Sequence, residues 1–216
     1  DLEFSSDWHN SLKLGFDVEE LCWPSWLKQM LEEAGISLHV LPSSVFRPGG
    51  TDSERTVSTE AHADFSLPVG CKIVGGTTDS IAAFLASGCN EVGQAVTSLG
   101  STIAIKMLSD IKVDNADFGI YSHRLDDTWL VGGASNVGCR ILRHLKFSDD
   151  ELQRLSANME IPEEPENAWG YYPLVNPGER FPINDPNLQP RLTPAPTDRG
   201  EYLKRLFVAM SDVEST

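Results

Sequence analysis

The sequence predicts an α/β fold, and three observations lead to this class. The chain has 216 residues and 40% apolar side chains, enough to bury the core of one large domain or two smaller ones. Short β-prone runs alternate with segments of helical apolar periodicity. Two of the β-prone runs lead directly into a glycine-containing turn that a helical pattern follows. We therefore expect turns that connect strands to helices, the usual place for ligand contacts in such folds.

Two helices and a loop are expected in the first 60 residues. Residues 17–20 form a capping-box pattern for a short helix, which Pro24 ends. A second helix is expected over residues 26–34 and should end at Gly35. Residues 43–60, rich in Ser, Thr, Gly and charge, are expected to form an exposed loop.

A strand, a turn and a helix follow between residues 71 and 88. Residues 71–74 form a short apolar run, expected to be a buried strand that leads into Gly75 and Gly76. Residues 81–86 are apolar on every side, which predicts a wholly buried helix capped by the preceding Thr-Thr-Asp. The turn then places Asp79 at the start of that helix.

The second half begins with a hairpin and a third strand. Residues 95–98 and 102–106 are β-prone and flank Leu99-Gly100-Ser101, so a hairpin is expected with this turn at its tip. A strand at 128–131 should end at Gly132-Gly133-Ala134-Ser135 and lead into a helix over 137–145.

The last third contains two helices and a proline-rich segment between them. Residues 148–151 form a capping box for the first helix. Nine of the 13 prolines lie between residues 162 and 196, so this segment should be extended and should wrap the surface. Apolar residues at helical spacing between 203 and 210 predict a docked helix.

Charge and cysteine content exclude several classes of function. A formal net charge of -15 and a pI near 4.6 oppose non-specific binding to nucleic acid or to anionic membranes. The four cysteines show neither metal-ligand spacing nor a disulfide framework, so a reducing compartment is expected. No run approaches the roughly 18 apolar residues of a membrane helix, and the first residues lack the features of a signal peptide.

Asp79 is the candidate catalytic residue, and two interpretations of it are open. Asp is a favoured helix cap, so its role there can be purely structural. A carboxylate on a rigid helix can also orient a substrate hydroxyl and help to hold Mg²⁺. In the second interpretation Thr78 and Ser80 are candidate substrate-binding residues, and the magnesium contact of Asp79 passes through water.

Two hydroxyl-bearing turns are candidate nucleotide contacts. Gly100, Ser101 and Thr102 can bind phosphate through backbone N–H groups and two hydroxyls, although an ordinary hairpin turn has the same composition. The second turn, Gly133-Ala134-Ser135, can contact the nucleotide or serve only tight strand-to-helix packing. Neither a Walker motif nor a G-x-G-x-x-G pattern is present. The five histidines are dispersed, and surface or capping roles are expected for them; Trp8 is a candidate wall of a sugar site.

These motifs resemble those of the FGGY carbohydrate kinases, relatives of actin, hexokinase and the Hsp70 ATPase. Residues 75–80 resemble the G-x-x-D motif of the family's catalytic base, and the two turns resemble its phosphate loop and its G-G-A-S-type nucleotide turn. The resemblance is strongest to the plant and cyanobacterial branch called xylulose-kinase-like or D-ribulokinase. It is carried by residues 7–15 (DWHNSLKLG), 76–86 (GTTDSIAAFLA), 121–127 (YSHRLDD) and 178–182 (GERFP).

The resemblance implies an RNase H-like α/β fold that spans the junction of two kinase domains. Residues 1–90 would be the end of the sugar-binding, catalytic-base domain, and residues 91–216 the start of the nucleotide-binding domain, with the extended segment at 162–196. The chain has no initiator methionine and is expected to be an internal fragment that is inactive alone.

The implied reaction is transfer of the γ-phosphoryl group of ATP, with Mg²⁺, to a terminal hydroxyl of a ketopentose, with D-ribulose as the expected acceptor. The alternatives are a xylulokinase or another polyol kinase, and a non-catalytic nucleotide-binding or assembly module that retains the fold. The expected location is the cytoplasm, or the chloroplast if the source is a plant or an alga.

Overall fold

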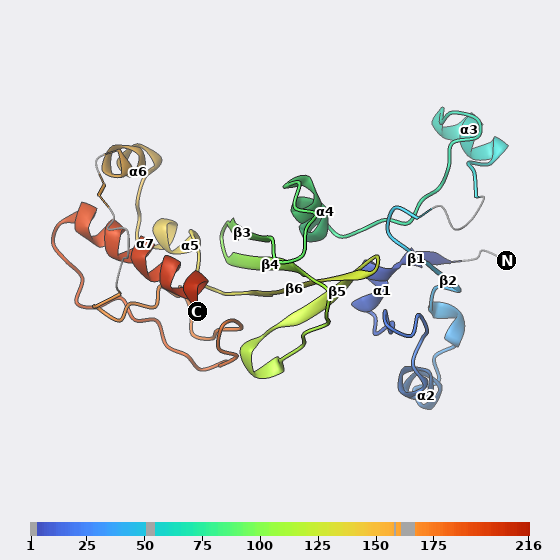
Figure 1. Cartoon of the computed structure of the whole chain (residues 1–216), viewed down its shortest axis with the longest axis horizontal. Coiled ribbons are helices and arrows are strands. Elements are labelled where there is room, and N and C mark those ends of the chain that lie inside the picture. Colours follow the sequence, from blue (N-terminus) through green and yellow to red (C-terminus); the bar gives the residue numbers. More distant parts are fainter. Residues whose placement is uncertain (1–3, 51–54, 158, 161–166) are drawn as a thin grey trace. The chain divides into compact units, whose positions relative to one another are not determined.

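The computed structural model describes residues 4–50, 55–157, 159–160 and 167–216 (Figure 1). The chain forms two compact units. Unit 1 contains residues 1–90 and 123–130, and unit 2 contains residues 91–122 and 131–216. The division therefore follows Asn90 but returns the segment 123–130 to unit 1. The functional labels of the two sequence-predicted domains stay predictions.

Unit 1 is built around a small parallel sheet and short helices. Strand β1 (Ser5–Asp7) pairs with β2 (Ser44–Phe46), with Ser6 opposite Val45. The helices of unit 1 are α1 (Trp8–Leu12), α2 (Ser25–Glu33), the 3₁₀ helix η1 (Leu38–Val40), α3 (Thr59–Phe65) and α4 (Asp79–Ala86).

One buried cluster of unit 1 is mainly aromatic. Trp8, Phe16 and Val18 are buried together, and Trp23 and Trp129 pack partly buried against them. Phe16 and Trp23 meet edge to face at a centroid distance of 5.0 Å, a favourable arrangement for two aromatic rings. This cluster fixes α1, which is too short to be stable without tertiary packing.

The sequence-based expectation for α2 is confirmed, whereas two others in the first 60 residues were wrong. Residues 17–20 form a turn instead of a helix, because the Asp17 carboxylate accepts the N–H groups of Glu19 and Glu20 while its backbone pairs with Cys22. The expected loop at 43–60 contains β2 and the start of α3. A three-residue strand is too short for its alternation to show in the sequence.

The two expectations around Asp79 need a partial correction. Residues 71–74 form only an isolated bridge, Lys72 with Thr56, and Ile73 and Val74 are 49% and 51% exposed. Helix α4 forms as expected, but only Ile81 and Phe84 on it are buried. An all-apolar composition cannot distinguish a buried helix from one whose alanine face is exposed, because the partner surface decides burial.

Unit 2 contains most of a four-stranded sheet with the order β3-β4-β6-β5. Its strands are β3 (Ala95–Leu99), β4 (Ile103–Ser109), β5 (Tyr121–Leu125) and β6 (Thr128–Ala134). The predicted hairpin of β3 and β4 is confirmed, with Leu99 opposite Ile103. Strand β6 runs three residues beyond the expected end, through both glycines, and β5 was not predicted. The hairpin end of β5 and β6, residues 123–130, belongs to unit 1.

The helices of unit 2 enclose its main core. They are the 3₁₀ helix η2 (Ala116–Phe118), α5 (Arg140–His144), α6 (Asp149–Ser156) and α7 (Arg199–Ser215), and α5, α6 and α7 are labelled in Figure 1. Leu203 and Leu206 of α7 are fully buried with Ile141 of α5. The capping box is confirmed, because the Ser148 side chain accepts the Glu151 N–H.

The proline-rich segment covers this core. Between residues 167 and 196 the structure describes neither helix nor strand, as expected, and residues 161–166 lie outside the described part. The segment nevertheless contributes buried side chains to the core, including Tyr171 and Leu174, 1% exposed each. No helix in the described part of the chain is long and apolar enough to cross a membrane.

Candidate functional site

Asp79 is exposed at the first position of α4 in unit 1. Thr78 occupies the N-cap position, so Asp79 is not the cap that one interpretation made it. Its Oδ1 accepts the Ser80 N–H at 2.7 Å. The carboxylate therefore lies at the N-terminal end of the helix. Among the described residues, no hydrogen-bond donor contacts its second oxygen, Oδ2. A group in this position is accessible to an external hydroxyl.

Thr78 carries a buried hydroxyl that lacks a partner in the described part of unit 1. Its side chain is 6% exposed, and the N-cap position gains no side-chain hydrogen bond. A buried polar atom of this kind costs free energy unless water or a ligand satisfies it. Ser80, the other candidate for substrate binding, is exposed. Of the three sequence-predicted residues, Asp79 and Ser80 are therefore exposed, whereas the Thr78 hydroxyl is buried without a partner among the described residues.

The turn before α4 packs against the start of α1. A Cβ on Gly76 would lie 3.3 Å from Asp7 Oδ2, and one on Gly75 would lie 2.2 Å from the Arg47 carbonyl oxygen. Only glycine fits at position 75 for this reason. The Asp7 carboxylate in turn caps α1 by accepting the N–H groups of His9 and Asn10.

His9 is a residue whose role the sequence did not reveal. The expectation of surface or capping histidines was wrong here, because His9 is 1% exposed. Its Nδ1 is 2.7 Å from Thr77 Oγ1, and its Nε2 is 2.7 Å from the Arg124 carbonyl oxygen. The contacts span 68 and 115 residues of sequence, so spacing within a local motif could not have indicated them.

The turn at residues 100–102 lies in unit 2 and is held by hydrogen bonds from residues 139 and 140. The N–H groups of Cys139 and Arg140 donate to the carbonyls of Gly100 and Ser101 at 2.8 and 3.3 Å. A Cβ on Gly138 would lie 2.6 Å from Thr102 Cα, so this glycine permits the close approach. Ser101 and Gly100 are exposed, and a Cβ on Gly100 would lie 3.7 Å from Thr102 O, an ordinary van der Waals contact. The turn is therefore held rigidly while its outer side is accessible.

Residues 133–135, expected to form the second turn, are instead the end of strand β6 and the residue after it, and they lie beside the first turn. The Ile103 N–H donates to Val137 O at 2.7 Å, and the Ser135 N–H donates to Ile103 O at 2.9 Å. The structure thus brings together the two turns that were predicted to contact one nucleotide.

The side chains of the second turn face the interior of unit 2. A Cβ on Gly133 would lie 2.3 Å from the ring of Phe181. Ser135 is fully buried, and its hydroxyl donates to Glu179 Oε2 at 2.7 Å. Packing accounts for both residues, and nucleotide contact by Gly133, Ala134 and Ser135 stays a prediction.

Glu179 is the second residue whose role was missed. This carboxylate is 2% exposed and accepts hydrogen bonds from Ser135 Oγ, the Asn136 N–H, the Arg180 N–H and the Tyr172 hydroxyl. Four donors compensate the burial of its charge. Burial and the nearby Glu179 charge raise the pKa of Tyr172, so its hydroxyl stays protonated and donates. Glu179 therefore holds the end of β6 and the residues after it.

Among the described residues, no three His, Cys, Asp or Glu side chains converge as metal ligands. Mg²⁺ is commonly held by one or two carboxylates together with substrate phosphates and waters. The water-mediated contact of Asp79 with Mg²⁺ stays a prediction.

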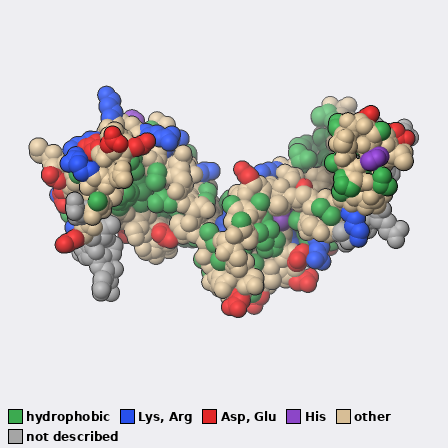
Figure 2. Space-filling view, turned by 90° about the horizontal axis from the view of Figure 1, so that it is seen from above, with side chains coloured by type: hydrophobic (Ala, Val, Ile, Leu, Met, Phe, Trp, Pro, Cys, Tyr) green, Lys and Arg blue, Asp and Glu red, His purple; other side chains and the backbone are tan. Residues whose placement is uncertain are grey.

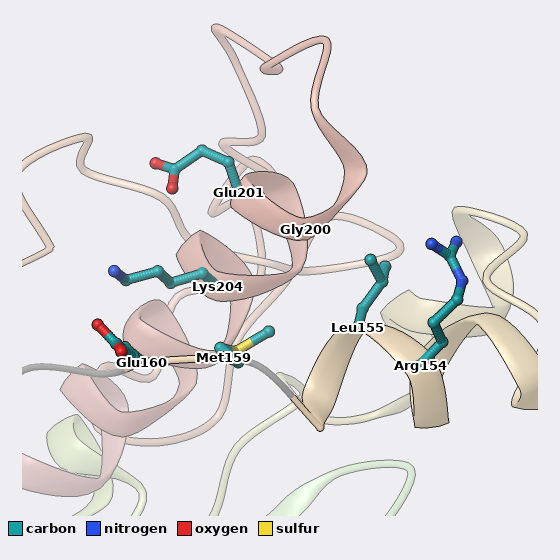
Figure 3. Close-up of a pocket in the computed structure, with 7 residues that line it drawn as sticks. All are labelled: Arg154, Leu155, Met159, Glu160, Gly200, Glu201 and Lys204. Atoms are coloured by element: carbon teal, nitrogen blue, oxygen red, sulfur yellow. The ribbon is translucent and has the colours of Figure 1, made fainter.

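The cavities in the described part of unit 2 include one that adjoins the turn at residues 100–102 through Leu99 and Ile103. A cavity of about 410 Å³ opens between α6 and α7, and Figure 3 shows Lys204 and Glu201 on one side and Leu155 on the other. A second, of about 310 Å³, is lined by β3 and α7 residues that include Leu99 and Met210. On the face shown in Figure 2, acidic and basic side chains are interspersed among the described residues.

Comparison with solved structures identifies the fold. Xylulose kinase from Brucella ovis matches with a TM-score of 0.76 and 20% identity, over 97% of this chain and 43% of that one. Xylulose kinase from Rhodospirillum rubrum matches with a TM-score of 0.73 and 21% identity, over 99% of this chain and 42% of that one. The chain has the sugar kinase fold.

A glycerol kinase from Plasmodium falciparum, solved with ADP, has the same fold at 15% identity and a TM-score of 0.68, over 98% of this chain and 43% of that one. The predicted α/β class of the actin and hexokinase type is thereby confirmed. The sequence matches no protein-family model. The chain spans less than half the length of the solved kinases that it matches.

Proposed function

We propose that this chain is part of an ATP-dependent sugar kinase and supplies its catalytic base and a phosphate-binding turn. The observation that carries the proposal is the exposed Asp79 carboxylate at the start of α4, on a glycine turn fixed by α1, within a sugar kinase fold. The proposed acceptor is the terminal hydroxyl of a ketopentose, D-ribulose in the first place. Solved relatives of the fold include enzymes named for xylulose, gluconate and glycerol, which supports a polyhydroxylated acceptor.

Asp79 would accept a hydrogen bond from the attacking hydroxyl through its uncommitted oxygen and take up the proton late in the reaction. Phosphoryl transfer through a loose transition state demands positioning more than a strong base. The buried hydroxyl of Thr78 would gain its missing partner from the sugar or from a bound water. Each of these roles uses a group that the structure leaves available.

The turn in unit 2 would bind phosphate oxygens through the Ser101 and Thr102 hydroxyls and the nearby backbone. ATP supplies the phosphoryl group and Mg²⁺ neutralises its charge. Rigid donors are effective here because they need no rearrangement as charge develops. The contacts of Gly138 and Cys139 with this turn provide the rigidity.

The experiment is an ATP-dependent phosphorylation assay of a sugar panel, performed with a chain of full kinase length that contains these residues. We expect turnover with D-ribulose above that with D-xylulose, glycerol and gluconate. The 216-residue chain alone should show none, because the reaction needs both substrates held by the whole fold. Nucleotide binding without phosphorylation of any sugar would favour the non-catalytic alternative. Turnover by the 216-residue chain alone would contradict the expectation that the reaction needs the whole kinase fold.

A further inference from the structure

We propose that His9 is a positioning residue for Asp79 and acts through the side chain of Thr77. This inference deepens the proposed function and rests on it. The sequence indicated no such role for His9, and the two hydrogen bonds of its ring described above are with Thr77 and Arg124. The argument starts from the two ring nitrogens of a buried imidazole.

The hydrogen-bond partners determine which ring nitrogen of His9 carries the hydrogen. A backbone carbonyl accepts only, so Nε2, 2.7 Å from Arg124 O, must donate. In the neutral ring Nδ1 is then the acceptor, and it takes the hydrogen of the Thr77 hydroxyl at 2.7 Å. The ring therefore links residue 124 to residue 77 with a defined polarity.

The Arg124 end of this link is itself firmly anchored in unit 1. The Arg124 guanidinium lies over the ring of Trp8, 5.0 Å from its centroid, and donates to the carbonyls of Val18 and Glu19. Trp8, adjacent to His9 on α1, belongs to the core of this unit. His9 is thus held at a fixed place from which it can restrain Thr77.

The Thr77 end determines where the Asp79 carboxylate lies. Thr77 is two residues before Asp79, and Gly76 on its other side rests against Asp7. Asp79 is exposed, and among the described residues its carboxylate accepts only the N–H of the adjacent Ser80. Its position is therefore set by the backbone of the turn, and the His9 contact is the long-range side-chain hydrogen bond that holds that turn.

Two conservative variants separate the two ends of the link. Counting bonds from Cβ, an Asn amide reaches the place of Nδ1 and a Gln amide reaches that of Nε2. His9→Asn should keep the contact with Thr77, and His9→Gln should keep the contact with Arg124 only. In a chain of full kinase length, we expect kcat to fall at least tenfold in His9→Gln and to stay within threefold of wild type in His9→Asn.

Thr77→Val removes the same hydrogen bond from the other side. It should lower kcat as much as His9→Gln does, with the KM for ATP unchanged, and the double variant should be no slower than either single one, since both remove one interaction. Equal losses in His9→Asn and His9→Gln, or additive losses in the double variant, would overturn the inference. Thermal unfolding of each variant shows whether a loss of kcat reflects loss of the fold.

A second readout keeps the test independent of activity. In the 216-residue chain, the amide NMR signals of residues 77–80 should shift in His9→Gln and stay near their wild-type positions in His9→Asn. If these signals behave as expected while the full-length kinase phosphorylates no sugar, the proposed function fails and the positioning role stands. If the amide signals of residues 77–80 shift in neither variant, the positioning role fails.

Discussion

At the scale of single residues, the structure separates groups that bear chemistry from groups that hold them. Asp79 and Ser101 are exposed, whereas His9, Glu179 and Ser135 are buried and hydrogen-bonded behind the turns. The sequence predicted the exposed residues Asp79 and Ser101 as site candidates, because acids and hydroxyls next to glycines form a local pattern. His9 and Glu179 were missed, because the contacts of His9 with Thr77 and Arg124 and the contact of Glu179 with Ser135 span 44 to 115 residues of sequence.

Gly138 offers a test of how the phosphate-binding turn is held. In Gly138→Ala the new methyl group would lie 2.7 Å from Ser101 O and 2.6 Å from Thr102 Cα, so backbone must move. We expect a loss of about 1–3 kcal/mol in the free energy of unfolding, as is usual for overpacking. Urea denaturation of the 216-residue chain measures this change.

The matched control is Gly100→Ala in the same turn, where the nearest atom would be 3.7 Å away. Its free energy of unfolding should stay within about 0.5 kcal/mol of wild type, as for substitutions away from packed contacts. Equal stability of the two variants would show that Gly138 does not bear on the turn.

At the scale of elements, those with strong local signals were predictable, whereas β5, the short strand β2 and the turn at residues 17–20 were not. The β3 and β4 hairpin, α2, α6 and α7 have strong local signals and form as expected. The strand expected at residues 71–74 does not form, since its apolar side chains find no sheet to cover them. The burial of α4 was also overestimated, because part of its apolar surface is left uncovered in the same way.

The contact between α6 and α7 gives a prediction on pH dependence. Arg199 on α7 donates to both Glu151 oxygens, at 2.9 and 2.8 Å, and this holds the pKa of Glu151 below its ordinary value of 4.5. A lowered pKa in the folded state contributes stability above the unfolded pKa, and this stability disappears as the pH falls through the folded value.

Glu151→Gln should therefore reduce the acid sensitivity of the melting temperature of the chain between about pH 5 and pH 3. The effect is small because the pair is solvent-exposed. Asp150→Asn, in the same first turn of α6, is the control. Its melting temperature should depend on pH as that of the wild type does, and should differ in this from Glu151→Gln. If the melting temperatures of wild type and Glu151→Gln fall equally as the pH is lowered over this range, the assigned role of the Arg199–Glu151 pair is contradicted.

At the scale of the whole molecule, the sequence predicted the fold class, and the site roles of its motifs stay predictions. The α/β sugar kinase fold agrees with that prediction, and the turns at residues 100–102 and 133–135 lie together in unit 2 as expected. The net charge of -15 means that an anionic nucleotide needs local donors, which the hydroxyl turn would supply in the proposed function. Long-range support of the turns could not be predicted, because it depends on tertiary contacts.

The central claim is that Asp79 is the catalytic base, and substitution by Asn in a chain of full kinase length tests it directly. Asn keeps the shape and removes the proton acceptor, so kcat with D-ribulose should fall by about 10²-fold or more, as general-base roles predict. Asp149→Asn is the matched control, an exposed acid at the first position of α6, and should keep wild-type kcat. A decrease of less than about tenfold in Asp79→Asn, roughly 1.4 kcal/mol of barrier, would contradict the assignment.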